Sequence, residues 1–249
     1  MKLFWPSRSI FRLIPTALAE LLTAALLGSA VTAQAQSFCA SDGQLQPARL
    51  VERFINADCD SCWKDPETPK AGAGELALDW VTPGSHFDNA PLSAVATRDA
   101  LARLESLKQA APAASSVSRQ AVRGIKGAGL RVAHGLPLAE YLGASIELKP
   151  VPAAARGQTW TAWLALVETL PAGTEGSPVA RNLVRNLFQT NWTLSKKLSK
   201  QEQTRFFDQR SMSIAQGVDA SRLRVIGWVE NEKGQIVAAA ESLCAPEKP

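Results

Sequence analysis

The amino-acid sequence predicts an α/β first half followed by a β-rich second half. Two strand-like apolar patterns, over residues 48–57 and 75–81, are followed by one amphipathic helical pattern that ends near residue 109. Short strand patterns separated by turn residues then dominate from about residue 130 to the end of the chain. We therefore expect an α/β region over residues 36–150 and a β-rich region with inserted helices over 151–249, the second packed on the first.

The first 35 residues have the three parts of a secretory signal peptide. Basic residues begin the segment, an apolar stretch follows that is densest over Leu21–Leu27, and small residues end it at Ala33-Gln34-Ala35. Pro15 and Glu20 interrupt the apolar stretch, which is shorter than the roughly 20 residues of a membrane-spanning helix. We expect cleavage after residue 35 and a periplasmic or secreted mature protein without a membrane span; a retained membrane anchor is the less favoured alternative.

All four cysteines lie after this leader, at positions 39, 59, 62 and 244. An even number of cysteines in an oxidising compartment predicts two disulfides, and three connectivities are allowed. Closeness in sequence favours Cys59–Cys62, which leaves Cys39 to pair with Cys244 and join the two ends of the mature chain. A loop of this length stabilises a protein by about 4–5 kcal/mol in the chain-entropy treatment of disulfides.

The elements of the first half are predicted from apolar spacing and turn residues. The strand over 48–57 has alternating apolar residues, and the strand Glu75–Val81 ends at Thr82-Pro83-Gly84. Asp88-Asn89-Ala90-Pro91 is a helix-start signal, and apolar residues then recur on one helical face as far as Gln109. The small and polar residues of Gln109–Gln120 predict a loop or linker.

The second half is predicted to contain mostly strands, with two helices among them. The predicted strands are Leu130–Ala133, Ala144–Leu148, Thr159–Glu168, and a final hairpin of 222–229 and 235–242 across Asn231–Gly234. Ser177-Pro178 predicts the start of a helix, because apolar residues then recur every four positions. A capping box at Ser199–Glu202 predicts the start of another.

Cys59 and Cys62 follow the first predicted strand at Cys-x-x-Cys spacing. A cysteine pair where a strand meets a helix has the geometry of a thioredoxin-like site. The free N–H groups and positive dipole end of the helix would stabilise a thiolate on Cys59, and Cys62, one turn further on, could resolve a mixed disulfide. These two residues are therefore the candidate catalytic residues of a thiol–disulfide oxidoreductase.

The residues around the pair argue partly against that chemistry. Asp58 and Asp60 flank Cys59, and nearby negative charge raises the pKa of a thiol. Lys64 offsets only part of this effect. An inert structural disulfide is therefore a nearly equal alternative for Cys59–Cys62.

The chain resembles a family of secreted bacterial thioredoxin-like proteins of unknown function in four stretches: LVERFINADCDSC, LALDWVTPGSHFDNAP, SPVARNLVRNL and VIGWVENEKGQIVAAA. The resemblance spans most of the chain after the leader. It implies a thioredoxin-like core with a β-rich extension, and it assigns a site only to Cys59 and Cys62. Thioredoxin-like oxidoreductases carry a cis-proline opposite their cysteine pair, normally just before the third strand. Thr82-Pro83 follows the second predicted strand instead, so it does not occupy that position.

Other charged and metal-binding residue types give weaker signals. Neither His86 nor His134 has a ligand-like spacing to the cysteines, so no metal and no other cofactor is expected. Asp79 and Asp88 are candidates for carboxylates that line a site, but residues of this kind more often cap turns or helices, which is the favoured expectation. Residues 178–224 carry nine Lys/Arg against three Asp/Glu, which favours a solvated helical surface over a site for an anionic partner. A nucleic-acid partner conflicts with export and is excluded.

Two functional hypotheses follow. The favoured one is a non-enzymatic envelope protein, a scaffold or a partner-binding protein, in which both disulfides are structural. The alternative is a periplasmic thiol–disulfide oxidoreductase acting on a protein partner, in which Cys59 attacks and Cys62 resolves. The flanking aspartates and the unplaced proline favour the first.

Overall fold

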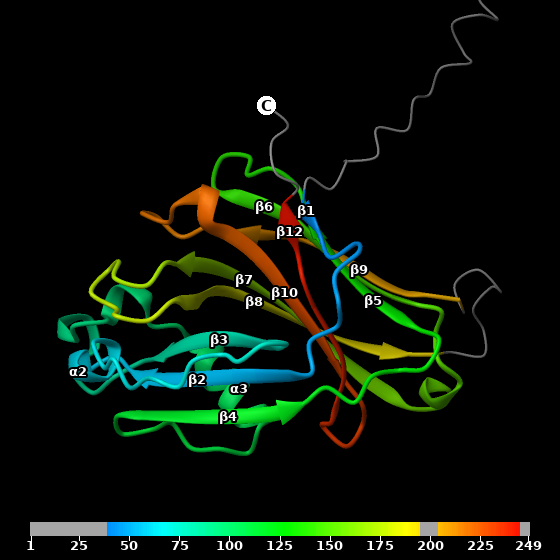
Figure 1. The fold of residues 1–249 in the computed structure, drawn as a ribbon, viewed down its shortest axis with the longest axis horizontal. Coiled ribbons are helices and arrows are strands. Elements are labelled where there is room, and N and C mark those ends of the chain that lie inside the picture. The colour runs from blue at the N-terminus through cyan, green and yellow to red at the C-terminus, as the bar shows by residue number, and fades with distance from the viewer. Residues whose placement is uncertain (1–38, 195–203, 245–249) are drawn as a thin grey trace, which may run out of the picture. The chain divides into compact units, whose positions relative to one another are not determined.

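A computed structural model describes residues 39–194 and 204–244, which form two β-sheets (Figure 1). The predicted signal peptide and the helix predicted at Ser199 lie outside the described residues. The larger sheet has seven strands in the order β11-β10-β7-β8-β3-β2-β4. Their bounds are β2 Arg49–Asn56, β3 Glu75–Thr82, β4 Ser115–Ala121, β7 Thr159–Leu170, β8 Arg181–Thr193, β10 Leu223–Glu230 and β11 Ile236–Glu241.

The smaller sheet has five strands in the order β12-β1-β5-β6-β9. These are β1 Cys39–Ala40, β5 Gly129–His134, β6 Tyr141–Lys149, β9 Phe206–Ser213 and β12 Leu243–Cys244. Two α-helices lie in the described part of the chain, α2 Asp60–Trp63 and α3 Arg98–Ser106. Short 3-10 turns occur at η1 Phe87–Asn89, η2 Ser93–Val95, η3 Ala153–Ala155 and η4 Ala220–Arg222. None of the helices in this part is long and apolar enough to cross a bilayer.

The apolar residues of the two sheets face each other and form the largest core. Side chains of β5, β6 and β9 pack there against those of β7, β10 and β11. The sheets approach closely at Gly227 of β10, where an added Cβ would lie 2.5 Å from Val132 Cγ1 and 3.0 Å from Ile146 Cδ1. A side chain at this position would have to push the sheets apart, so glycine is required by the packing.

A second core covers the other face of the larger sheet. Along β7, Leu164 and Leu166 belong to the core between the sheets, while Ala165 and Val167 alternate with them and belong to this second core. Helix α3 packs here through Ala100 and Leu104 against strand residues that include Phe54, Trp80, Trp163 and Trp228. The period of two explains why β7 is apolar at almost every position: both of its faces are buried.

The predicted α/β class with a thioredoxin-like core is wrong. Strands are the main regular structure of the described residues, and one of the two α-helices has only four residues. Strands β2, β3 and β4 come from the first predicted region, and β7, β8, β10 and β11 come from the second, yet all join one sheet. A parallel β2–α2–β3 unit does exist, but it is embedded in a sheet whose other neighbours are mainly antiparallel.

Three elements differ from their prediction. The helix predicted to start at Asp88-Asn89-Ala90-Pro91 begins only at Arg98, with Thr97 as its N-cap, and the residues before it form the 3-10 turns η1 and η2. Residues predicted to begin a helix at Ser177 instead lead into the long strand β8. A spacing of four residues is also a multiple of two, so the apolar pattern over this segment fits a strand as well as a helix. The predicted linker contains β4, an edge strand with a single neighbour, whose mostly polar residues suit an exposed position. The strands predicted over 48–57, 75–81, 130–133, 144–148 and 159–168, and the terminal hairpin, are confirmed.

Candidate functional site

The Cys59–Cys62 disulfide lies where β2 gives way to α2, as predicted. Strand β2 ends at Asn56, and Cys59 is the N-cap residue of α2. The Cys59 Sγ atom accepts a hydrogen bond from the backbone N–H of Cys62 at 3.3 Å, and both cysteines are half-buried. The structure therefore combines an accessible disulfide with a hydrogen-bond donor aimed at one of its sulfur atoms.

Asp58, on one side of Cys59, is turned toward the loop after β3. Its carboxylate accepts hydrogen bonds from the Ser85 backbone N–H at 2.6 Å, the Ser85 hydroxyl at 2.7 Å and the His86 backbone N–H at 3.2 Å. The His86 ring lies 3.0 Å from it through Nδ1. The Ser85 hydroxyl bond is the main cause that lowers the pKa of Asp58 to about 2. Gly84 permits this arrangement, because a Cβ there would overlap the Asp58 carboxylate.

Asp60, on the other side, is paired within its own helix. Lys64 Nζ lies 2.6 Å from Asp60 Oδ2, four residues further along the chain, and both side chains are exposed. The two negative charges that the sequence places beside Cys59 therefore each have a nearby donor. The objection to thiolate chemistry that these aspartates raised is weaker in the structure than in the sequence.

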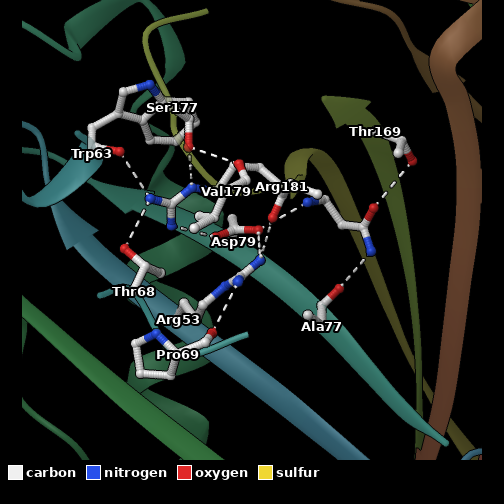
Figure 2. Close-up of polar contacts among 12 residues, drawn as sticks. Arg53, Trp63, Thr68, Pro69, Ala77, Asp79, Thr169, Ser177, Val179 and Arg181 are labelled. Carbon is white, nitrogen blue, oxygen red and sulfur yellow. Dashed lines mark hydrogen bonds and ion pairs between the residues drawn. The ribbon is translucent and has the colours of Figure 1, made fainter. Parts of the chain in front are cut away.

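A buried ion-pair network lies behind the disulfide (Figure 2). Asp79, in the middle of β3, is fully buried and is the shared acceptor. Its Oδ2 accepts from Arg53 Nη2 of β2 at 2.5 Å and from the backbone N–H of Asn182 at 2.8 Å, and its Oδ1 accepts from Arg181 Nη1 of β8 at 3.1 Å. Asp79 was expected to cap a turn; instead it is a strand residue that joins three neighbouring strands.

This network holds the segment that follows the disulfide. Arg181 Nη2 donates to the Trp63 carbonyl at 2.9 Å and to Thr68 Oγ1 at 3.2 Å, and its guanidinium lies 4.9 Å from the centre of the Trp63 ring. Arg53 Nη1 donates to the Pro69 carbonyl at 3.1 Å. Figure 2 shows both guanidinium groups reaching from the sheet to this segment. The chain after Cys62 is thus tied to β2 and β8 by buried charged donors.

The same arginines are close to the disulfide itself. Arg53, Arg181 and Cys62 line one small cavity of about 40 Å³, together with the start of β4. Positive charge near a cysteine favours its thiolate form, but here Asp79 is paired with both arginines and Asp65 lines the same cavity, so only part of that charge acts on Cys62. Sequence reasoning did not identify Arg53 and Arg181. The available signal was a charged residue inside an otherwise apolar strand pattern, as in LVERFIN for Arg53 and LALDWV for Asp79.

The second predicted disulfide, Cys39–Cys244, is also present, and it joins β1 to β12. His134 of β5 is opposite Cys39 in the register of the smaller sheet. Its Nδ1 lies 2.9 Å from the Gly135 carbonyl, and burial lowers the pKa of the imidazole. One ligand-type atom from each of the three residues lies within 4.8 Å of the others. The two cysteines are bonded to each other, so they offer no thiolate to a metal ion.

The basic segment 178–224, which was predicted to form a solvated helical surface, has no α-helix in its described part. The described part of this segment is mainly strand, and most of its arginines are matched by carboxylates. The pairs are Arg181–Asp79, Arg185–Glu168, Arg205–Glu147, Arg222–Asp219 and Arg224–Glu241. Arg210 stacks over the Phe188 ring at 4.6 Å. The interpretation as a solvated helical surface is therefore wrong for the described residues.

Comparisons with known proteins give little further guidance. No protein family and no curated protein matches the sequence. Among solved structures, the chain is similar to HBP35 of Porphyromonas gingivalis, with a TM-score of 0.44 and 13% sequence identity, over 83% of this chain and 78% of that one. Of the family resemblance noted in the sequence, the structure supports the disulfide-bonded Cys-x-x-Cys pair.

Proposed function

We propose that the protein is a thiol–disulfide exchange protein of an oxidising compartment outside the cytoplasm, with Cys59–Cys62 as its reactive group. The observation that carries the proposal is the half-exposed disulfide whose Cys59 Sγ accepts the Cys62 backbone N–H. A sulfur that accepts such a bond is stabilised as a thiolate, and a stabilised thiolate is the better leaving group in exchange. The leader predicted over residues 1–35 supports the compartment.

The exchange step is balanced by the partner's own thiols. A partner thiolate attacks Cys59 Sγ, the Cys59–Cys62 bond breaks, and Cys62 leaves as a thiolate beside the cavity that Arg53 and Arg181 also line. A second partner thiolate then attacks the mixed disulfide and releases Cys59. The partner is oxidised to a disulfide and the protein is reduced to a dithiol. The reverse sequence, in which Cys59 attacks, reduces a partner disulfide.

The proposal is tested by the reduction potential of the Cys59–Cys62 pair. We expect a value between about −270 and −120 mV, the range of known exchange proteins. The Cys39–Cys244 disulfide in the same sample is the internal control. Alkylation and mass spectrometry report the redox state of both pairs, and Cys39–Cys244 should stay oxidised under conditions that already reduce Cys59–Cys62. A Cys59–Cys62 potential below about −300 mV, typical of structural disulfides, would exclude exchange as the function.

Single-cysteine variants test the assigned roles. Cys62→Ser should accumulate a mixed disulfide with a disulfide-containing peptide, because the Cys59 thiolate attacks that disulfide, one peptide thiolate leaves, and no resolving sulfur remains to break the new bond. Cys59→Ser should accumulate much less. Equal trapping by both variants would contradict the assignment of Cys59 as the attacking residue.

A partner-binding protein with two structural disulfides is the second candidate. The observation in its favour is that Cys62 packs against a small core formed by residues such as Ile55, Ala57 and Trp63, as a structural crosslink would. In that case the Cys59→Ala/Cys62→Ala protein would keep its partner binding. Under the first proposal, that variant loses all exchange activity.

A further inference from the structure

A pocket of about 340 Å³ opens beside the buried arginine network, on the side of β3 and β8. Its lining residues include Arg53, Lys70, Asn182 and the fully buried Arg181, together with the apolar Ala172 and Val179. The volume is within the range of sites for small molecules. Neither Cys59 nor Cys62 lines this pocket.

The network beside the pocket has more positive than negative charge. Arg53 is 3% exposed and Arg181 is 1% exposed, and both form their ion pair with the same carboxylate, Asp79. Asp65 also attracts Arg181, but it is exposed to solvent and forms no ion pair with either arginine in the described part of the chain. Buried charges in proteins are normally paired, because removing an unpaired ion from water is costly. The two arginines and the one carboxylate together therefore carry one excess positive charge.

The hydrogen bonds of Arg53 show the same deficit. Its Nη1 and Nη2 atoms donate to Pro69, Asp79 and Ala180, whereas its buried Nε has no partner. Leaving a buried charged donor unsatisfied is unfavourable, because its hydration is lost and not replaced. Burial and the neighbouring Arg53 both lower the pKa of Arg181, although Asp79 opposes them. An anion in the pocket would supply the missing negative charge.

We propose that this pocket binds a small organic monoanion, with its carboxylate at Arg53 and Lys70 and its apolar part along Ala172 and Val179. A single negative charge matches the one excess positive charge of the buried network. The apolar lining and the volume favour a carboxylate with a short hydrocarbon body over a bare inorganic ion. The proposal does not depend on the exchange chemistry, although Arg53 and Arg181 also line the small cavity beside Cys62.

The direct test follows the side-chain Nε–H signal of Arg53 by ¹⁵N NMR of the full chain. Butyrate and benzoate are titrated, with sodium phosphate and sodium chloride at matched ionic strength as comparisons. We expect a saturable shift of this signal with both carboxylates, and a small shift that does not saturate with phosphate or chloride. No shift with either carboxylate, or tighter binding of phosphate, would overturn the proposal.

Variants with matched controls locate the binding to this pocket. Ala172 is exposed, so Ala172→Leu should fill the pocket without disturbing the core and weaken binding more than tenfold, whereas Ala111→Leu, an exposed loop alanine elsewhere, should have no effect. Lys70→Ala should weaken binding about fivefold through the lost attraction, whereas Lys64→Ala removes the same charge outside the pocket and should not. Wild-type affinity in both Ala172→Leu and Lys70→Ala would exclude the site.

Discussion

The chemistry available to Cys59 depends on the contacts of the residues beside it. A carboxylate that accepts several hydrogen bonds is held in its charged form, and its orientation is fixed by its donors. Asp58 has its donors in the Ser85–His86 turn, and Asp60 has Lys64. Sequence proximity alone therefore overstates how much these two residues act on the sulfur atom.

The pKa of Asp58 gives a pH-dependent prediction. Because its folded-state pKa, about 2, is below the ordinary value of 3.8, Asp58 contributes stability that is complete above about pH 4 and is lost as the pH falls toward 2. Urea unfolding of wild type and Asp58→Asn should show wild type more stable at about pH 6, with the difference shrinking between about pH 4 and pH 2. A difference that is the same at both ends would contradict the assigned hydrogen bonds.

Asp60→Asn is the matched control for that experiment. It removes the neighbouring carboxylate from an exposed ion pair with Lys64. Exposed pairs contribute little, so the expected change in unfolding free energy is less than about 1 kcal/mol.

At the residue scale, the sequence predicted the cysteines well and the buried charges poorly. The disulfide partners follow from an even cysteine count and from spacing. The partners of Asp79 cannot be found this way, because Arg53 is 26 positions away and Arg181 is 102 positions away. These ion pairs exist only because β2, β3 and β8 are neighbours in the sheet, and that neighbourhood is a property of the whole fold.

At the scale of elements, strands with two buried faces, or with alternating apolar and polar residues, could be predicted from the sequence. Strands whose residue pattern is explained only by their position in the sheet could not. Strand β7 has a long apolar run that no other element type explains as simply. Strand β4 is polar because it is an edge, so its sequence resembles a loop. Strand β8 has apolar residues at even spacing, which a helix and a strand share, and only its two neighbours in the sheet decide between them.

Helix α3 is attached to the larger sheet by one buried arginine in addition to its apolar contacts. Arg103 is fully buried and donates to Glu52 of β2 at 2.7 and 2.8 Å and to Glu230 of β10 at 2.7 Å. Its guanidinium lies 5.1 and 5.0 Å from the ring centres of Trp163 and Trp228. Burial disfavours the charge, but the two carboxylates outweigh it and raise the pKa of Arg103.

Removal of this arginine should destabilise the protein severely. Arg103→Met leaves two buried carboxylates without their partner, and we expect a loss of about 3–5 kcal/mol in unfolding free energy, measured by urea denaturation near neutral pH. Arg103→Lys keeps the charge but not the forked geometry, so its loss should be smaller. Arg98→Met, at an exposed position of the same helix, should change stability by less than about 0.5 kcal/mol. Similar small losses for both methionine variants would show that Arg103 does not anchor the helix.

At the scale of the whole molecule, the two disulfides differ in what they can do for stability. Cys39–Cys244 spans 205 positions and joins the first described strand to the last, whereas Cys59–Cys62 spans three. In the chain-entropy treatment, the stabilisation grows with the logarithm of the loop length, because a crosslink removes conformations from the unfolded chain. The long-range disulfide should therefore stabilise the fold, and the short one is free to be oxidised and reduced at little cost to it.

Two double variants measure this difference directly. Cys39→Ser/Cys244→Ser should lower the free energy of unfolding by about 5 kcal/mol, and Cys59→Ser/Cys62→Ser by only about 1–2 kcal/mol. Urea denaturation of both variants beside wild type gives the comparison, with the second serving as the control for serine substitution itself. Wild type treated with a mild reductant should match the second variant in stability, because the exchange site is reduced before the long-range disulfide. If the short disulfide contributed as much stability as the long one, it would be a structural crosslink, and the proposed exchange function would lose its physical basis.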